Sequence, residues 1–323
     1  MKYTAHSRQY TGATAIADCR FQIADCRMAG GDIRLGASWR PWRLAGLILM
    51  LGFCGRALAI GECGAQFLKM GVGARACAMG EAFAAVADDA SAIYWNPAGL
   101  RKAERTEVLG MQNFWLLDMS YQYVAAVVPS RLGSFGVAAA YSSSGKIPRY
   151  EEFRKVGEYS AYDAAGTIAY ANHVTSLSYG ASIKLIQQAI DSVSATGFAA
   201  DLGLLYDLGM LSAGVAVQNI GPSIKFIEKA DPLPLNVKAG LAVKVGPVVL
   251  AADANKARDN SFDLNVGAEG VVLGVLALRA GYNTANSFTA GGGVTWKMVS
   301  VDYAFVPYKE IDATHRISAR VRF

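Results

Sequence analysis

From Thr106 to the C-terminus, side-chain character alternates with a period of two, and this alternation constrains the fold more than any other feature. In residues 176–188 one face is formed by Leu177, Tyr179, Ala181, Ile183 and Leu185. The opposite face carries Gly, Ser and Lys, and across the chain such faces hold mostly Gly, Ser, Ala and Asn with few charges. A soluble sheet would present long charged groups to water. The pattern therefore predicts strands with lipid outside and a packed polar interior.

We predict a closed barrel, because no stretch after residue 59 reaches 18 apolar residues and backbone groups inside a membrane must all be paired. Aromatic residues near strand ends, at Tyr121, Tyr123, Tyr303 and Phe305, are assigned to the lipid face as interfacial girdles. An even number of strands suits an antiparallel bacterial barrel, and 12 or 16 strands also fit the pattern. The 14 predicted strands are 106–116, 119–129, 132–143, 159–171, 174–188, 196–208, 210–219, 235–245, 247–256, 260–270, 274–283, 286–296, 297–306 and 313–323.

Two connections are longer than the others, at residues 145–158 and 220–234. They follow the third and seventh strands, so both leave the barrel at the same end. Bacterial barrels have short periplasmic turns and long outer loops, so we assign both connections to the outer face. If the N-terminal segment enters from the periplasm, odd-numbered strands run outward.

Residues 40–59 have the three parts of a bacterial secretory signal. Arg40 and Arg43 precede an apolar run at 44–55, and Ala57-Leu-Ala59 is a small-x-small cleavage site. Residues 1–39 precede this signal and are interpreted as a non-native or mis-assigned extension, with Met28 as a candidate start. We therefore predict export to the bacterial outer membrane and a mature chain that begins near residue 60.

Removal of the first 59 residues changes what charge and cysteine content imply. They hold eight of the 31 basic and three of the 26 acidic residues, so the remainder carries 23 of each. A formally neutral chain gives no reason to expect a nucleic-acid partner. Cys63 and Cys77 are the two cysteines left, and they could form a disulfide but no metal site. We expect no cofactor.

The segment 60–105 differs from the rest of the chain, being rich in Ala and Gly with short helical runs. Asp88 and Asp89 precede a short Ala-rich run and suit a helix N-terminus. Pro97 ends that run, because the residue before a proline is disfavoured in the α region, and Gly99 permits a turn. We predict an all-β transmembrane antiparallel barrel, with residues 106–323 forming the wall and residues 60–105 a partly helical hatch in the lumen.

The last predicted strand ends at the C-terminal Phe323, with Ile317, Ala319 and Val321 on the same lipid-facing side. A terminal aromatic residue on an amphipathic final strand resembles the assembly signal of bacterial outer-membrane proteins. The expected partners are therefore outer-membrane lipid and, through this strand, the outer-membrane assembly machinery.

Five short motifs in the hatch segment resemble the N-terminal region of PorV/PorQ-type proteins, which belong to the wider FadL-like group of long-chain fatty-acid transporters. They are Gly64-Ala-x-Phe-Leu, Gly71-Val-Gly-Ala-Arg75, Met79-Gly-Glu-Ala-Phe83, Ala87-Asp-Asp-Ala90 and Tyr94-Trp-Asn-Pro-Ala-Gly-Leu100. The resemblance implies a 14-stranded barrel with an internal hatch. It also implies that the Asn-Pro-Ala motif, here Asn96, Pro97 and Ala98, lies in that hatch. The chain is shorter than the larger transporters, which leaves little for ligand-capturing outer loops.

Three functions are compatible with these features. The first is a plugged channel for hydrophobic small molecules such as fatty acids. The second is a type IX-like secretion component or shuttle that binds cargo proteins at the cell surface, which the resemblance to PorV-type proteins implies. The third is an outer-membrane hydrolase using His173 or His315, which we disfavour because a histidine at a strand end is more often an interfacial polar residue than a base. We expect no enzymatic activity.

Two groups of side chains outside the hatch have alternative interpretations. Ile224, Phe226 and Ile227 could form an outer lip that contacts ligand or partner, or could simply pack in a capped turn, which we favour. Alternating charges predicted to face the lumen could form ion pairs that hold the hatch, which we favour, or a selectivity lining. These charges are Lys184, Lys238, Lys244, Asp263, Glu269, Arg279, Asp302, Arg320 and Arg322.

Overall fold

The computed structural model describes residues 63–323, except 116–118, 152, 227, 286 and 309–312. The chain divides into two units, residues 1–55 and 56–323, and only the second falls within this range. The predicted signal at 40–59 and the preceding extension therefore lie outside the described residues. No helix in the described part of the chain is long and apolar enough to cross a membrane.

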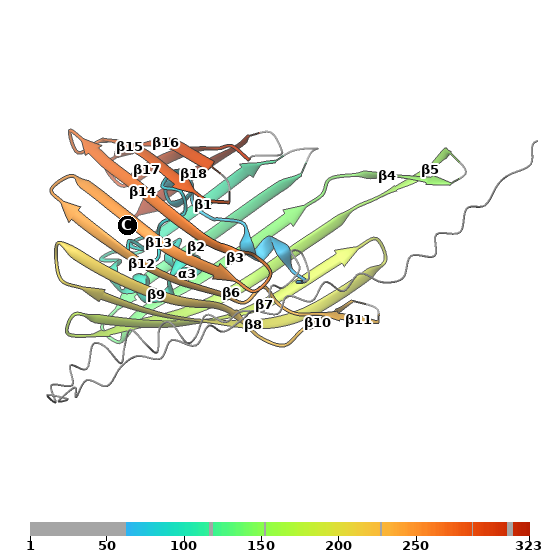
Figure 1. The fold of residues 1–323 in the computed structure, drawn as a ribbon, viewed down its shortest axis with the longest axis horizontal. Coiled ribbons are helices and arrows are strands. Elements are labelled where there is room, and N and C mark those ends of the chain that lie inside the picture. Colours follow the sequence, from blue (N-terminus) through green and yellow to red (C-terminus); the bar gives the residue numbers. More distant parts are fainter. Residues whose placement is uncertain (1–62, 116–118, 152, 227, 286, 309–312) are drawn as a thin grey trace, which may run out of the picture. The chain divides into compact units, whose positions relative to one another are not determined.

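Fourteen antiparallel strands close into one barrel (Figure 1). Neighbouring strands pair along the chain, and the circle closes where the first strand pairs with the last, from Glu107 with Arg322 to Phe114 with His315. The predicted number of strands is confirmed, and each predicted run overlaps one strand of the barrel. The barrel strands are β1 (Glu107–Phe114), β2 (Ser120–Ser130), β3 (Gly133–Ser143), β6 (Ala161–Val174), β7 (Leu177–Ile190), β8 (Val193–Asp207), β9 (Leu211–Ile220), β12 (Asn236–Val245), β13 (Val248–Ala257), β14 (Phe262–Val272), β15 (Leu276–Asn283), β16 (Ser287–Trp296), β17 (Val299–Val306) and β18 (Thr314–Arg322).

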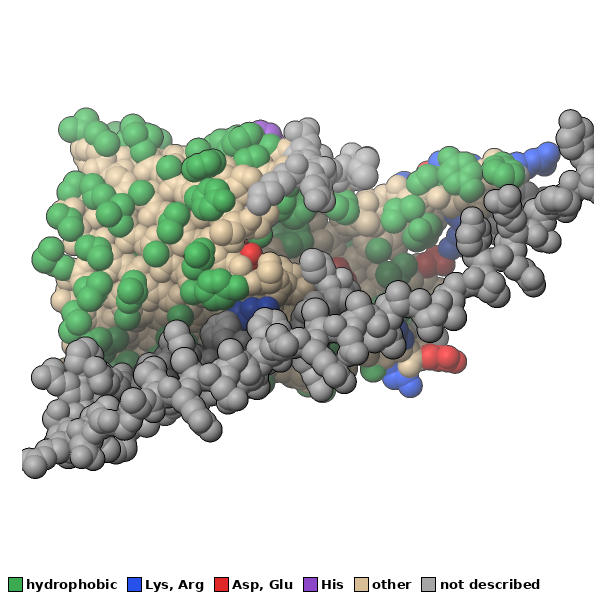
Figure 2. All heavy atoms as spheres, viewed as in Figure 1, with side chains coloured by type: hydrophobic (Ala, Val, Ile, Leu, Met, Phe, Trp, Pro, Cys, Tyr) green, Lys and Arg blue, Asp and Glu red, His purple; other side chains and the backbone are tan. Residues whose placement is uncertain are grey.

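The alternating pattern places apolar side chains on the outer wall. On β7, Leu177, Tyr179, Ile183 and Leu185 are exposed, whereas Lys184 and the other residues of the opposite face are mostly buried. Figure 2 shows hydrophobic side chains distributed over the visible wall of the barrel. This is the arrangement that a lipid-embedded barrel requires, because all strand edges are paired and the exterior is apolar. The fold predicted for a bacterial outer-membrane protein is confirmed.

One assignment to the lipid face is wrong. Tyr121 and Tyr123 point into the lumen and are almost completely buried, whereas Tyr303 and Phe305 do face outward. In the middle of β2 both faces are apolar, because the inward face packs against the hatch and the outward face, with Val124 and Val128, meets lipid. Alternation in polarity therefore could not distinguish the two faces of this strand.

The two ends of the barrel differ. Connections of two or three residues join alternate strands at one end, for example at Lys297 and Met298. At the opposite end lie the two long connections, and each forms a small hairpin of its own: β4 (Ile147–Glu151) with β5 (Arg154–Tyr159), and β10 (Ile224–Phe226) with β11 (Lys229–Asp231). Figure 1 shows the first hairpin extending well beyond the barrel. We refer to these as the short-turn end and the hairpin end; the predicted grouping of both long connections at one end is confirmed.

The segment 63–105 runs through the lumen from the hairpin end to the short-turn end. Its start is bound at the hairpin end, where Gly64 N–H donates to the carbonyl of Pro232 at 3.0 Å. Its last residues lie at the other end, where Thr106 accepts from the N–H of Phe323 at 2.9 Å. The described segment therefore enters at the end assigned to the outer face, and β1 then runs back toward that end. Its helices are η1 (Gln66–Lys69), α2 (Ala74–Ala78), α3 (Ala92–Trp95) and η2 (Pro97–Lys102).

Inward-facing glycines let the barrel wall approach this segment closely. At several of them a Cβ atom would overlap hatch atoms: at Gly281 the backbone of Gly80, and at Gly180 the backbone of Pro97. Glycine lacks the Cβ that would occupy this space. We call the following residues the glycine belt: Gly180, Gly203, Gly214, Gly267 and Gly281.

Candidate functional site

The side chain of Asn96 is completely buried, and it binds two other residues of the hatch and one strand of the barrel wall. Its Nδ2 donates to the carbonyl of Ala84 at 2.8 Å and to that of Leu204 on β8 at 3.1 Å. Its Oδ1 accepts from the N–H of Ala98 at 3.2 Å, which caps η2. Pro97 occupies the first position of η2, where a missing N–H is tolerated. Three of the amide's four hydrogen-bonding positions are thus used where the chain changes from α3 to η2.

Gly99 and Ala98 complete the predicted motif. A Cβ at Gly99 would overlap the carbonyl of Ala87. Glycine is therefore needed where the backbone at residue 99 passes close to the backbone at residue 87. Asp89 lies before α3 as predicted, and its Oδ1 accepts from the backbone N–H of Ser91 at 2.9 Å and from its hydroxyl at 2.5 Å. The structure therefore places all of the predicted hatch residues together inside the lumen.

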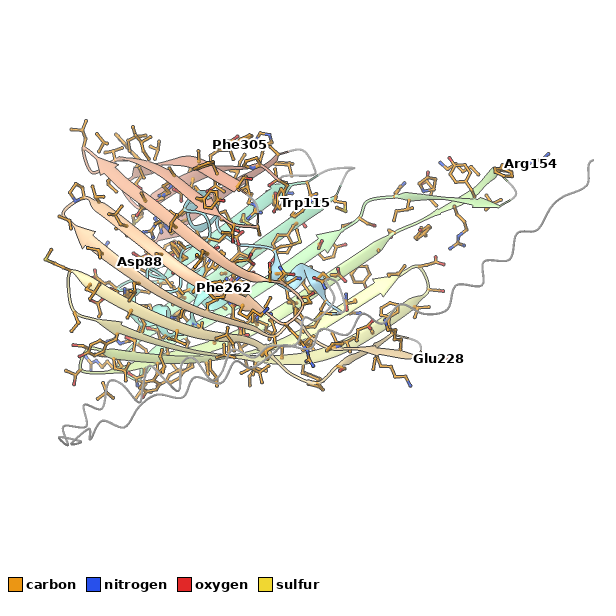
Figure 3. The ribbon with its side chains drawn as sticks, in the orientation of Figure 1. Asp88, Trp115, Arg154, Glu228, Phe262 and Phe305 are labelled. Carbon is orange, nitrogen blue, oxygen red and sulfur yellow. The ribbon has the colours of Figure 1, made fainter. Side chains whose placement is uncertain are left out.

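An ion-pair network joins the hatch to five strands. Arg75 of α2 binds Asp88, Asp89 and, at 2.8 Å, Glu269 of β14. Glu269 also binds Arg279 of β15 at 2.6 Å. Asp88 lies inside the barrel near the short-turn end (Figure 3).

The network extends around the lumen on the other side of Asp89. Asp89 meets Arg320 of β18 at 3.2 Å, and Glu107 of β1 lies between Arg320 and Arg322. Arg279 continues to Asp302 of β17 at 2.8 Å. Buried charges require such partners, since burial of an unpaired ion is costly. The geometry matches the favoured interpretation, in which lumenal charges hold the hatch.

Two lumenal charges do not follow this pattern. Lys238 is buried, and among the described residues no carboxylate lies within ion-pair distance; its Nζ instead lies 4.2 Å from the centroid of the Trp95 ring. Lys244 faces the lumen at the short-turn end but is exposed. Two residues of the predicted set remain: Asp263 accepts from Thr284 at 3.3 Å, and Lys184 pairs with Asp201 of β8 at 2.8 Å.

Two further anchors were not identified from the sequence. Asp253 on β13 accepts from the backbone N–H groups of Phe83 and Ala84 at 2.8 and 2.7 Å. Arg316 on β18 is completely buried and donates to the carbonyl of Gly71 at 3.2 Å and to Cys77 Sγ at 2.7 Å. Inward-facing charges on predicted strands were the available signal. Their partners include backbone groups and the Cys77 thiol of the hatch, and such pairings leave no pattern in a sequence.

A small apolar cavity lies between the hatch and the wall formed by β2, β3, β6 and β7. Its volume is about 20 Å³, which is room for about one water molecule. We call this cavity the nook. It is lined by Leu68, Ile93, Tyr94, Tyr121, Tyr123, Ala140, Ala165, Thr167 and Lys184.

The nook has an apolar body and one charged edge. Tyr94 closes it on the hatch side, where its hydroxyl donates to the carbonyl of Leu68 at 3.2 Å. Lys184 forms the polar edge and is bound to Asp201 and Asn219, both at 2.8 Å. Because this ammonium group is already paired, the free surface of the nook is mainly aromatic and aliphatic.

The hairpin end covers the start of the hatch. Ile224 is buried and fits against Gly197, while Phe226 is partly buried against the core. These positions match the capped turn rather than an exposed lip; Ile227 lies outside the described residues. Asp259, between β13 and β14, accepts from Gln66 at 2.9 Å and from Lys69 at 3.0 Å. Although burial opposes its ionisation, these hydrogen bonds and the Lys69 charge hold the pKa of Asp259 below its usual range.

The short-turn end opens into a cavity of about 900 Å³, which we call the vestibule. Its floor is the hatch, including Arg75, Ala85 and Asp88. Its mouth is bounded by the short turns, including Gly246, Gly274 and Lys297. The hatch therefore separates a wide polar opening at one end from the nook.

Neither histidine forms part of a catalytic arrangement among the described residues. His173 accepts from Arg101 Nε at 2.8 Å, and His315 lies on the outer wall within 2.7 Å of the Tyr303 hydroxyl. Cys63 and Cys77 are both free thiols, so the disulfide that the sequence permitted is not formed. Phe323 is exposed and follows directly after the last residue of β18, and its role as an assembly signal stays a prediction.

Comparison with solved structures identifies barrels of the same fold. The Ralstonia pickettii toluene transporter TbuX superposes with a TM-score of 0.60 at 15% identity, covering 78% of this chain and 98% of that chain. A deltaS2 mutant of the TodX monoaromatic hydrocarbon channel gives a TM-score of 0.59 at 15% identity, covering 78% and 99%. The FadL-like part of the predicted resemblance is thereby confirmed as a fold.

A family model also matches the sequence. The model of the Uncharacterised protein family (UPF0164) matches residues 59–302. No curated protein sequence matches the chain. The particular likeness to PorV/PorQ-type proteins stays a prediction.

Proposed function

Because the chain belongs to the Uncharacterised protein family (UPF0164) and folds as a hatch-filled FadL-like barrel, we propose that it is an outer-membrane channel for small hydrophobic molecules. The observation that supports this proposal best is the nook, an apolar space between the hatch and a wall of small side chains. The nook has room for about one water molecule, so a larger ligand would enter only when Tyr94 or the neighbouring side chains shift. The similar barrels are described as a toluene transporter and a monoaromatic hydrocarbon channel.

The polarity of the lumen supports a route on this side of the barrel. The inward faces of β2 and β6 are mainly apolar, with Tyr121, Tyr123, Val127, Ala165 and Ala169 buried. The ion-pair network and the Asp253 anchor lie on other strands, namely β1, β13, β14, β15, β17 and β18. A hydrophobic molecule that moves from water to the wall containing β2 and β6 would gain about 25 cal/mol of free energy per Å² of apolar surface that it buries. Passage of molecules such as fatty acids is one form of this proposal.

Uptake of a hydrophobic fluorescent probe into liposomes tests the proposal. Ala165→Phe fills the nook and should reduce uptake at least about tenfold, because a phenyl group exceeds the space available. Ala164→Phe is the matched control, since Ala164 lies on the alternate face of the same strand. Each variant must retain the heat-modifiable electrophoretic mobility of a folded barrel. Equal uptake by the two variants would contradict the proposal.

A second candidate function rests on the β4–β5 hairpin. Phe153 is fully exposed and Tyr150 mostly exposed at its tip, which Figure 3 shows at Arg154, far from the barrel wall. Exposed aromatic side chains suit contact with a protein, as a secretion component that binds cargo would need. Deletion of residues 147–159 should abolish binding of secreted proteins under this function and leave probe uptake unchanged under the first.

A further inference from the structure

The turns at the short-turn end carry large apolar side chains at their tips. Leu273 is 94% exposed and Leu132 is 76% exposed, and Met210 and Met298 are also exposed. In Figure 2 the visible wall near this end shows hydrophobic side chains, whereas charged side chains gather toward the hairpin end. Short turns mark the periplasmic end of a bacterial barrel, where they lie at the inner leaflet of the membrane. Contact of these tips with lipid would remove their apolar surface from water, which is favourable.

Basic side chains accompany these tips on the lumenal side. Arg105, Lys244 and Lys297 line the vestibule, and none of the three has an ionic partner among the described residues. The other cations of the vestibule are neutralised: Arg75 and Arg322 by the ion-pair network, and Lys102 by Asp207 at 3.3 Å.

The unpaired acids of the vestibule do not offset these three cations. Among the described carboxylates that line the vestibule, Glu104 has no cationic partner, and its side chain is exposed. Asp88, Glu107, Asp207 and Glu269 all have cationic partners. The mouth therefore has an excess of positive charge at the depth where the turn tips meet lipid. Apolar tips beside free Lys and Arg side chains form the combination that attracts acidic lipid headgroups.

We propose that the short-turn end binds anionic phospholipid headgroups, with Arg105, Lys244 and Lys297 at the mouth of the vestibule as the binding side chains. The acyl chains would lie against the outer wall beside Leu273 and Met298, and the headgroup phosphate would extend over the rim toward the vestibule. This site holds whether or not the barrel passes hydrophobic molecules, since it uses neither the nook nor the hatch motif.

Trp296 is a natural reporter for this site. It is 69% exposed on the outward face of β16 and directly precedes Lys297. Trp95 is completely buried in the hatch and out of reach of lipid. Replacement of Trp39, Trp42 and Trp115 by Phe leaves Trp296 as the fluorophore that lipid can quench. The protein is then reconstituted in phosphatidylcholine vesicles that contain the same mole fraction of either brominated phosphatidylglycerol or brominated phosphatidylcholine.

We expect the brominated anionic lipid to quench Trp296 at least about threefold more effectively than the zwitterionic one at low salt, and less so at 1 M salt. R105Q/K244Q/K297Q should reduce this ratio to about one. K146Q/K155Q/K225Q, which removes three cations at the hairpin end, should leave it unchanged. A ratio of one in the parent protein, or a ratio unaffected by the first triple substitution, overturns the proposal. Free inorganic phosphate at millimolar concentration should not abolish the preference; if it does, the site is for a soluble anion.

Discussion

Asn96 shows how one side chain can define the centre of the hatch. Its amide satisfies a carbonyl of the hatch, a carbonyl of β8 and the first free N–H of η2 at the same time. The sequence predicts a special role for this residue because it precedes Pro97, where the chain must leave the α region. The partners on Ala84 and Leu204 are 12 and 108 residues away in the chain, and only the folded molecule reveals them.

Asn96→Asp should destabilise the barrel more than an equivalent change at the surface. The substitution keeps the shape, removes both N–H donors and buries a carboxylate against two carbonyl oxygens, at a cost of about 3 kcal/mol or more. Heat-modifiable mobility on electrophoresis should show a lower unfolding temperature for this variant. Asn260→Asp adds the same charge next to Lys69 and should not lower that temperature. Equal effects of the two changes would mean that the amide donors of Asn96 contribute little.

At the scale of the element, the start of the hatch is held at the hairpin end by side chains rather than by a strand ladder. η1 is four residues long, and Gln66 and Lys69 bind Asp259 in the loop between β13 and β14. So short a helix gains little from its own hydrogen bonds. The Asp259 contacts and the bond from Gly64 to Pro232 therefore hold η1 in the lumen.

This contact should be lost in acid. Since the pKa of Asp259 is lower in the folded protein, its contribution to stability is fully present above the unfolded value of about 3.9 and disappears as the pH falls through the folded value. Hydrogen exchange of residues 63–70, corrected for intrinsic rates, should accelerate between pH 5 and pH 2.5. In the Asp259→Asn variant, the amides of residues 63–70 should exchange rapidly at both pH values. In the Asp191→Asn variant, which changes an exposed turn, they should exchange as in the parent protein.

At the scale of the whole molecule, the hatch and the barrel have complementary shapes. The glycine belt brings the wall against the hatch backbone, and the ion-pair network and the Asp253 anchor connect the hatch to β1, β13, β14, β15, β17 and β18. A hatch held at this many points behaves as part of the barrel interior. Movements that admit ligand are then expected in side chains around the nook rather than in removal of the hatch.

Gly281→Ala tests this fit. The added Cβ would overlap the backbone of Gly80 and should destabilise the barrel by about 1–3 kcal/mol, because neither backbone can shift without displacing the hatch. Gly166→Ala is the control, since no atom lies within 4 Å of its added Cβ. Thermal unfolding followed by electrophoretic mobility should show a clear decrease for the first variant and none for the second. If both variants unfold at the same temperature, the hatch is not seated against the wall as described.

Much of the fold was predictable because lipid and a closed sheet impose a regular pattern. A period of two with an apolar outer face indicates strands, and the number of strands and the grouping of the long connections follow from counting and parity. The hatch was recognisable by its composition and its Asn-Pro-Ala motif. The two small hairpins were predicted as loops, because β10 and β11 are three residues each and the β4–β5 ladder is interrupted by an irregularity at Arg149 and Tyr150.

The sequence by itself determined which residues form strands and that most of their apolar faces meet lipid, since these properties depend on near neighbours and on solvent. Only the tertiary structure decided what fills the lumen. Tyr121 and Tyr123 face inward because the hatch offers them an apolar partner. Asp253 and Arg316 are used because buried polar groups of the hatch need partners. The nook and the vestibule arise in the same way, since each is space left between a wall and a hatch that are distant in sequence.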